Sequence, residues 1–153
     1  MIEMDLYKEM KVIVFQLLDK EYAMPVDYVM SIERVPYITR VPSVPDYVKG
    51  VINLKGMITP IIDLRMKFGV SDQEMNETTR VIIVSFHEME VGLIVDAAND
   101  VLTFSTDLIE SNPDFGGTRD VDFISGIVKL DNRLLILIKL DQILKPLNSP
   151  IMK

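Results

Sequence analysis

The sequence aligns with itself in two blocks, and neither block needs a gap. Residues 13–32 match residues 82–101 at an offset of 69 positions, and residues 48–64 match residues 124–140 at an offset of 76. In the first block Glu21 meets Glu90 and Asp27 meets Asp96, and the apolar alternation stays in phase. Two ungapped blocks in the same order favour an internal duplication over chance similarity between apolar strands.

Short apolar runs separated by turn residues indicate β-strands, because few runs have the 3.6-residue period of a core helix. We predict five strands before the segment 71–79, at 11–18, 21–26, 29–34, 51–54 and 57–62. We predict five more after it, at 80–86, 90–95, 101–104, 124–129 and 133–139. Short helical turns are expected at 45–48, 64–68 and 140–144. The prediction is an all-β fold of two related halves, about 11–64 and 80–140, for which closed five-stranded barrels would hide the strand edges.

Turn residues fall at matching places in both halves. Lys55-Gly56 and Asp131-Asn132 suit tight hairpin turns, and Asp19-Lys20 and Glu88-Met89 are weaker equivalents. Pro60 predicts an edge or a bulge in its strand, because proline donates no backbone hydrogen bond. The difference between the two offsets places an insertion in the second half, which we assign to a surface loop at 111–120.

Composition excludes several classes of function. A net charge of −7 and a pI near 4.7 disfavour nucleic acid as a partner. The chain has no cysteine and one histidine, so it cannot build the usual zinc site, and we expect no metal and no cofactor. No apolar run approaches the length of a membrane span and no signal peptide is evident, so we expect a cytoplasmic protein without direct membrane insertion.

Candidate catalytic residues are sparse, so we expect no enzyme. His87 lies beside a predicted turn, where a solvated side chain is expected rather than a base or a metal ligand. Asp27 and Asp96 are matched carboxylates, but neither is followed by the hydroxyl and glycine residues of an aspartic-protease turn. A structural role, with the carboxylates accepting backbone N–H groups, explains both better.

A surface for other proteins remains the favoured interpretation. Apolar residues run through the proline-rich connection after the third predicted strand, and they either serve recognition or pack between the halves. A small-ligand-sensing protein, with a groove between the halves as its pocket, is the alternative. It would require converging polar groups that the sequence does not show.

Six short motifs carry a resemblance to a known family. They are ITRVP at 38–42, PDYVKGVINLKG at 45–56, PIIDLR at 60–65, EVGLIVD at 90–96, DVL at 100–102 and ISGI at 124–127. Together they resemble the CheW family of chemotaxis adaptors over nearly the whole chain. The resemblance implies a single CheW-like domain over 1–153, with two SH3-like barrels that exchange or share terminal segments.

The resemblance also implies a non-catalytic adaptor that couples methyl-accepting chemotaxis receptors to the histidine kinase CheA. The partners would be the cytoplasmic tip of the receptors and the regulatory domain of the kinase. A CheW-like fragment of a CheV or CheA protein is the alternative within this family. We assign receptor binding to Val29, Ser31, Ile32, Gly50, Lys55, Gly56, Asp96 and Ala98, and kinase binding to Val101, Leu102 and Phe104.

Two positions depart from the family pattern. Lys55 replaces the usual arginine of the Asn-Leu-Arg-Gly motif, and Ser31 stands where many members have glutamate. Lysine does not reproduce the forked donor geometry of arginine. We therefore expect receptor binding mainly through apolar packing, with a weaker charged component.

Overall fold

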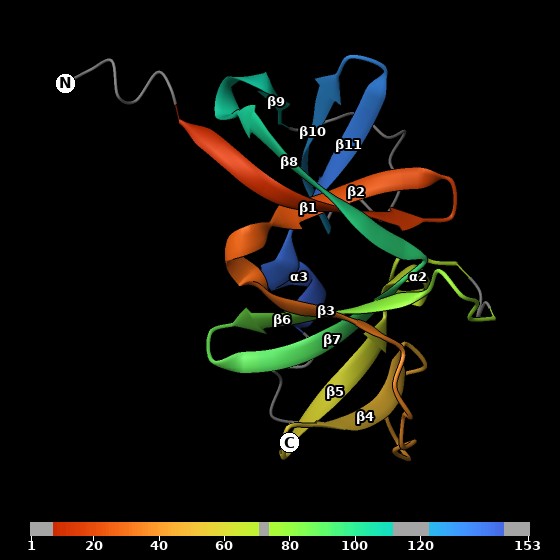
Figure 1. The fold of residues 1–153 in the computed structure, drawn as a ribbon. Helices are drawn as coiled ribbons and strands as arrows, with labels where there is room; N and C mark the ends of the chain where they lie inside the picture. Colours follow the sequence, from red (N-terminus) through yellow and green to blue (C-terminus); the bar gives the residue numbers. More distant parts are fainter. Residues whose placement is uncertain (1–7, 71–73, 112–122, 146–153) are drawn as a thin grey trace.

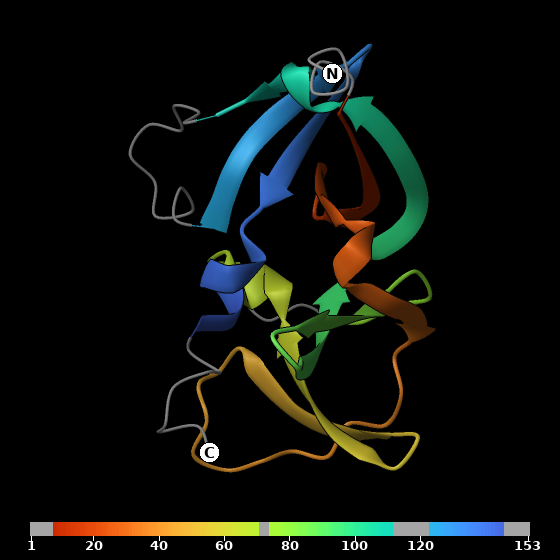
Figure 2. The same ribbon diagram turned by 90° about the vertical axis from the view of Figure 1, so that its left-hand side faces the viewer.

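The computed structural model describes residues 8–70, 74–111 and 123–145, and it consists mostly of β-strands (Figure 1). The strands form two sheets that stack end to end, with short α-helices at the junction between them (Figure 2). This arrangement confirms the predicted all-β fold with few helical turns, and it is consistent with two SH3-like subdomains. The predicted insertion at 111–120 lies, apart from Ser111, outside the described residues.

The first sheet has six strands in the order β8-β1-β2-β11-β10-β9. Their bounds are β1 Glu9–Leu17, β2 Lys20–Pro25, β8 Ala97–Ser105, β9 Ile109–Glu110, β10 Ile124–Leu130 and β11 Arg133–Ile138. The strand that we did not predict, β9, has two residues and pairs with β10 at the edge of the sheet.

The second sheet has five strands in the order β3-β6-β7-β5-β4. Their bounds are β3 Val29–Arg34, β4 Val48–Leu54, β5 Met57–Asp63, β6 Arg80–Phe86 and β7 Met89–Val95. Within the described residues, four short helical segments connect strands or follow them: η1 Val26–Tyr28, α2 Leu64–Lys67, η2 Thr106–Leu108 and α3 Leu140–Leu144.

Each sheet combines strands from both halves of the sequence. β1 and β2 leave the strands that follow them and join β8–β11, while β6 and β7 join β3–β5. The predicted halves at 11–64 and 80–140 therefore do not coincide with the two sheets. The chain crosses between the sheets at η1, and again where β7 passes into β8.

Strand pairing in the two sheets follows the offsets of the sequence alignment. Ser31 of β3 pairs with Ile83 of β6, and Asp100 of β8 pairs with Val14 of β1 at the matching positions. Each of these pairs follows a register shift in its ladder. The parallel pairs β5–β7 and β11–β2 also match. This agreement supports the predicted internal duplication. That the two halves arose from one ancestral copy stays a prediction.

Three apolar clusters hold the fold together. The largest lies between the sheets and takes Phe15 and Tyr22 from the first sheet and Ile82 and Leu93 from the second. Each sheet also curls around a smaller cluster on its other face. These clusters contain Val12, Val14, Ala23, Phe104, Val128, Leu135 and Leu137 in the first sheet, and Ile52, Ile61, Val81, Ile83 and Ile94 in the second.

The hairpin turns confirm the strongest turn predictions. Lys55 and Gly56 have φ angles of 51° and 87°, and Asp131 has φ 51°, as tight hairpins require. The two weaker turns lie one residue earlier than predicted. The turn before β2 begins at Leu18, and the turn before β7 begins at His87.

Two local predictions need correction. The segment 45–48 is not helical: the Val48 N–H donates to the Pro45 carbonyl at 3.0 Å, which closes a turn, and β4 begins at Val48. The edge alternative for Pro60 is wrong, because β5 stands between β7 and β4. The bulge alternative agrees better, since the β4–β5 register shifts between Val48 and Gly50, next to the Val51–Pro60 pair. The missing N–H of Pro60 costs no ladder bond to β4, since Val51 opposite it exchanges its backbone hydrogen bonds with Thr39 instead. The ladder to β7 begins only at Ile61.

Candidate functional site

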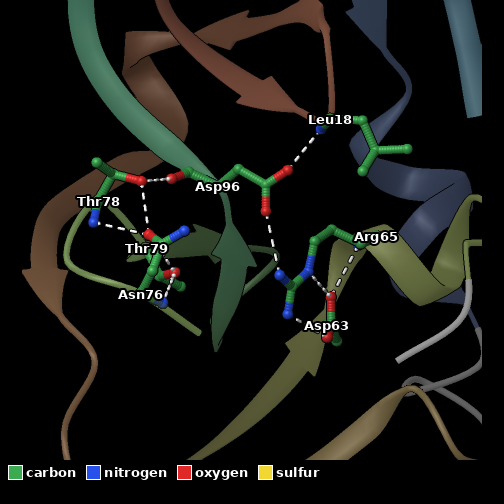
Figure 3. A network of polar contacts seen from close by, with 7 residues as sticks. All are labelled: Leu18, Asp63, Arg65, Asn76, Thr78, Thr79 and Asp96. Atoms are coloured by element: carbon green, nitrogen blue, oxygen red, sulfur yellow. Dashed lines mark hydrogen bonds and ion pairs between the residues drawn. The ribbon is translucent and has the colours of Figure 1, made fainter. Parts of the chain in front are cut away.

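A buried arginine lies at the junction of the two sheets (Figure 3). Arg65 of α2 donates through Nε to Asp63 Oδ1 at 3.0 Å and through Nη2 to Asp63 Oδ2 at 2.9 Å. The Asp63 side chain is completely buried, and only 2% of the Arg65 side chain is exposed. Asp63 Oδ1 also accepts the Arg65 backbone N–H, so one carboxylate both caps α2 and pairs with the guanidinium.

Asp96 extends this network across the junction. Arg65 Nη1 donates to Asp96 Oδ1 at 3.1 Å, and Asp96 Oδ2 accepts the Leu18 backbone N–H (Figure 3). Thr78 Oγ1 donates to the Asp96 carbonyl at 2.8 Å. Asp96 lies at the crossing from β7 to β8, and Leu18 lies in the β1–β2 turn, so the network ties α2 and β5 to the first sheet.

The electrostatics of the network favour its charged form. The hydrogen bond to Asp63 raises the pKa of Arg65 above its usual value, against the lowering effect of burial, and the charges of Asp63 and Asp96 act in the same direction. An arginine held in this way keeps its positive charge. The arrangement is an ion-pair network that ties the two sheets together.

The remaining candidate catalytic groups do not converge. Asp27, which matches Asp96 in the alignment, is exposed in η1 and takes no part in the network. His87 is exposed in the β6–β7 turn with φ 51°. Within residues 8–70, 74–111 and 123–145, no group of three or more His, Cys, Asp or Glu residues is placed to hold a metal ion.

The predicted receptor residues divide into separate groups. Val29 and Ala98 occupy matching positions on the edge strands β3 and β8, and both pack against the cluster between the sheets. Ile32 is 37% exposed further along β3. Asp96 is engaged in the arginine network rather than presented freely to a partner.

Ser31 and Lys55 line a different surface, a shallow groove at the end of the second sheet. The groove has a volume of about 240 Å³, and its other walls are Met30, Glu33, Leu54, Met57, Ile83 and Glu90. Lys55 is exposed at the tip of the β4–β5 hairpin and makes no ion pair with any residue that the structure describes. The structure thus brings Ser31 and Lys55 together in one groove, and Val29 and Ala98 do not line that groove.

The two glycines of the predicted set play backbone roles. Gly56 provides the positive φ of the hairpin turn, with open space around it. Gly50 is buried at φ +143°, and a Cβ atom there would lie 2.1 Å from the Thr39 carbonyl oxygen. Gly50 therefore allows the segment before β4 to pair with it, and it presents no side chain to a partner.

The predicted kinase residues follow β8 at the edge of the first sheet. Val101 is 49% exposed, and Leu102 is half-buried against the inner cluster of that sheet. Phe104 is only 4% exposed within the same cluster. The expectation of a surface role for Phe104 must be corrected, because its side chain is part of the core.

A hollow of about 500 Å³ also lies at the junction, between η1, the β6–β7 turn and the start of α3. Its walls include Tyr28, Phe86, His87, Lys139 and Asp141. The small-ligand alternative would use this hollow, and it stays a prediction.

Sequence reasoning missed two arginine networks. Arg65 was noted only as part of a motif, although two opposite charges, Asp63 and Arg65, within the otherwise apolar segment 61–66 are a signal, since buried charges are almost always paired. Arg133 was not singled out. It donates through Nε and Nη2 to both carboxylate oxygens of Glu21, at 3.0 and 2.8 Å, and its Nη2 lies 2.9 Å from Asp100 Oδ2.

Comparison with known proteins gives a consistent result. The family model described as CheW-like domain matches residues 11–147. The chain is 47% identical over 135 residues to the chemotaxis protein CheW of Bacillus subtilis, covering 88% of this chain and 86% of the relative. It is 36% identical to the chemotaxis protein CheW of Klebsiella aerogenes, covering 86% of this chain and 80% of the relative.

A solved structure agrees with these sequence matches. The scaffolding protein TtCheW of Thermoanaerobacter tengcongensis superposes with a TM-score of 0.80 at 34% identity, covering 86% of this chain and 90% of that chain. No helix within the described residues is long and apolar enough to cross a membrane. Family model, relatives and fold agree, and the chain belongs to the CheW-like family of chemotaxis adaptor and scaffold proteins.

Proposed function

We propose that this chain is a non-catalytic cytoplasmic adaptor that couples methyl-accepting chemotaxis receptors to the histidine kinase CheA. The observation that carries the proposal is the CheW-like match over residues 11–147 together with the two-sheet fold. The described side chains support it, since they form shallow apolar surfaces and a buried structural ion network rather than a converging reactive site.

The receptor tip contacts the exposed apolar side of β3, centred on Ile32 and bounded by Val29 and Ala98. Val29 and Ala98 are anchored in the core between the sheets, so they give this surface a rigid floor. Ser31, Lys55 and Gly56 extend the contact toward the β4–β5 hairpin, while Gly50 and Asp96 hold the backbone that supports it.

The regulatory domain of CheA contacts β8 around Val101 and Leu102, with Phe104 supporting this strand from the core. Receptor state then reaches the kinase as a coupling free energy between two binding events. The adaptor contributes contacts and geometry, and no bond is made or broken.

Matched substitutions can separate the two faces. Ile32 and Val101 occupy equivalent positions in the alignment and are both exposed aliphatic residues on edge strands. Ile32→Ser should weaken binding of a receptor cytoplasmic fragment about tenfold. Val101→Ser should weaken binding of the CheA regulatory domain about tenfold. Each substitution removes an aliphatic contact that becomes buried when the partner binds. Titration calorimetry of both variants with both partners gives the four affinities.

Each variant serves as the control for the other partner. If the unaltered protein binds neither partner, the adaptor function is wrong. If each variant weakens both partners equally, the two faces are wrongly placed. A steep loss of receptor binding between low and physiological salt would contradict the mainly apolar contact.

A further inference from the structure

The first sheet is closed at one end by an ion-pair cluster. Arg133 at the start of β11 reaches Glu21 on β2 and Asp100 on the edge strand β8. β1 and β2 separate β8 from β11 in the sheet, so this contact is possible only because the sheet is strongly curled. The three side chains are partly exposed, at 35% for Arg133, 27% for Glu21 and 40% for Asp100. The ion pairs therefore lie at the rim of the first sheet, outside its inner apolar cluster.

The matching end of the second sheet is open. The offsets of the alignment pair Glu21 with Glu90, Asp100 with Ser31 and Arg133 with Met57. Strand pairing agrees, because Leu130 pairs with Arg133 as Leu54 pairs with Met57, and Gln16 pairs with Glu21 as Ser85 pairs with Glu90. Ser31, Met57 and Glu90 all line the groove of about 240 Å³.

The open end therefore keeps one carboxylate of the cluster and lacks the arginine. Glu90 makes no ion pair with any described residue. Met57 occupies the position that matches Arg133, and it is 59% exposed. The charged groups on the groove are Glu33, Glu90 and Lys55, which leaves a net charge of −1 and favours a cation.

We propose that this groove binds an arginine side chain supplied by a partner protein. The guanidinium pairs with Glu90, and its aliphatic stem lies across Met30, Leu54 and Met57. Arg133 serves as the template, because it makes the corresponding contact with Glu21 within the chain. Arginine is favoured over lysine, since its planar fork binds a carboxylate through two hydrogen bonds and its stem packs on apolar side chains.

The inference rests on the proposed function and deepens it: the arginine would come from the receptor, because Ser31 and Lys55 on this groove belong to the proposed receptor contact. It makes the two ends of the molecule different: one end is already filled from within, and the other must be filled by a neighbour. Methionine suits the open end, since its flexible side chain can adapt to an inserted stem.

The first experiment uses N-acetyl-arginine methylamide as the probe and the full chain with ¹³C-labelled methionine methyl groups. Resonances are assigned with Met30→Leu and Met57→Leu variants. We expect saturable shifts of the Met30 and Met57 methyl resonances with the arginine probe. The neutral citrulline analogue, which has the same shape, should give none.

Variants of the groove test the role of Glu90. Glu90→Gln should weaken the arginine probe about tenfold or more, as expected for losing a charge-assisted pair. Glu33→Gln is the matched control, because it removes the same charge from the same groove at a position that matches Leu102 and not the cluster. It should change the affinity by less than about threefold. Met57→Arg should fill the groove from within and abolish the shift of the Met30 methyl.

The second experiment measures binding of the CheA regulatory domain and of the receptor fragment to the same variants. We expect Glu90→Gln and Met57→Arg to weaken the receptor fragment about tenfold and to leave binding of the CheA regulatory domain unchanged, and Glu33→Gln to weaken neither partner by that amount. Normal receptor binding by both variants would overturn the arginine contact and leave the adaptor function intact. Failure of the unaltered protein to bind either partner would refute the adaptor function. The methyl titration would still test the arginine site in that case. Equal methyl shifts with the arginine probe and the citrulline analogue would overturn the arginine site.

Discussion

The two arginine networks occupy opposite kinds of environment in two related halves. Arg65 is buried at the junction, and the positions that match Asp63, Arg65 and Asp96 are Lys139, Asp141 and Asp27, all exposed and outside any such network. Arg133 lies at a partly exposed rim, and its match is Met57. Each network is therefore present in one half only. The comparison shows that strand pairing is common to both halves, whereas charge pairing distinguishes them.

The difference in burial predicts very different contributions to stability. Removing one partner of a buried pair leaves a charge without compensation, which costs several kcal/mol. Removing one partner of an exposed pair costs little, because water replaces it. An arginine side chain should therefore be needed for stability at position 65 and nearly dispensable for stability at position 133.

The largest effect is expected for Arg65→Ala. This change leaves the fully buried Asp63 carboxylate without its guanidinium and should lower the free energy of unfolding by about 3–5 kcal/mol. Urea denaturation followed by circular dichroism measures it. Asp141→Ala, at the matching and exposed position, is the control and should change stability by less than about 0.5 kcal/mol. Equal losses in the two variants would contradict the asymmetry.

A smaller difference is expected between the matched glycines Gly50 and Gly126. Gly50→Ala should cost about 3 kcal/mol, because Gly50 has φ +143° and its Cβ would lie 2.1 Å from the Thr39 carbonyl oxygen. Gly126→Ala should cost about 1–2 kcal/mol, since its Cβ would lie 2.8 Å from the Glu110 carbonyl oxygen without a positive φ. Thermal unfolding of both variants ranks them, and a larger loss at Gly126 would reverse the comparison.

The smallest effect is expected for Arg133→Met, which copies the open end onto the first sheet. The free energy of unfolding should fall by less than about 1 kcal/mol, and the difference from the unaltered protein should shrink in 1 M salt. The loss in Arg65→Ala should persist at the same salt concentration, because buried pairs are screened much less. A loss at Arg133 as large as that at Arg65 would show that its rim is effectively buried.

Much of the fold could be predicted from the sequence because strand pairing leaves a local trace. The apolar alternation located the ten predicted strands to within a few residues, and β3 and β6 agree at both ends. Hairpins at Lys55-Gly56 and Asp131-Asn132 followed from residues that tolerate positive φ. The exchange of β1 and β2 between the halves was anticipated only from the family resemblance.

The missed features depend on contacts between distant positions. Asp96 and Leu18 are 78 positions apart, and Arg133 and Glu21 are 112 apart, so no local pattern reveals either contact. The early start of β8 at Ala97 was missed because Asp96 and the residues after it read as a turn. The kinase face was assigned to consecutive positions of a strand, although side chains alternate between its faces, so Leu102 and Phe104 lie together on the inner cluster of the first sheet.

The exchanged strands also affect the order in which a growing chain can fold. β3–β7 form a complete sheet once synthesis has passed Val95. β1 and β2 are made first and can pair with each other, but their outer neighbours β8 and β11 emerge only later. The earliest strands of the protein are thus completed last. Until then, the apolar face of the β1–β2 hairpin is covered only by the parts of the chain that have already folded beside it. During this time its unpaired strand edges favour association with other chains.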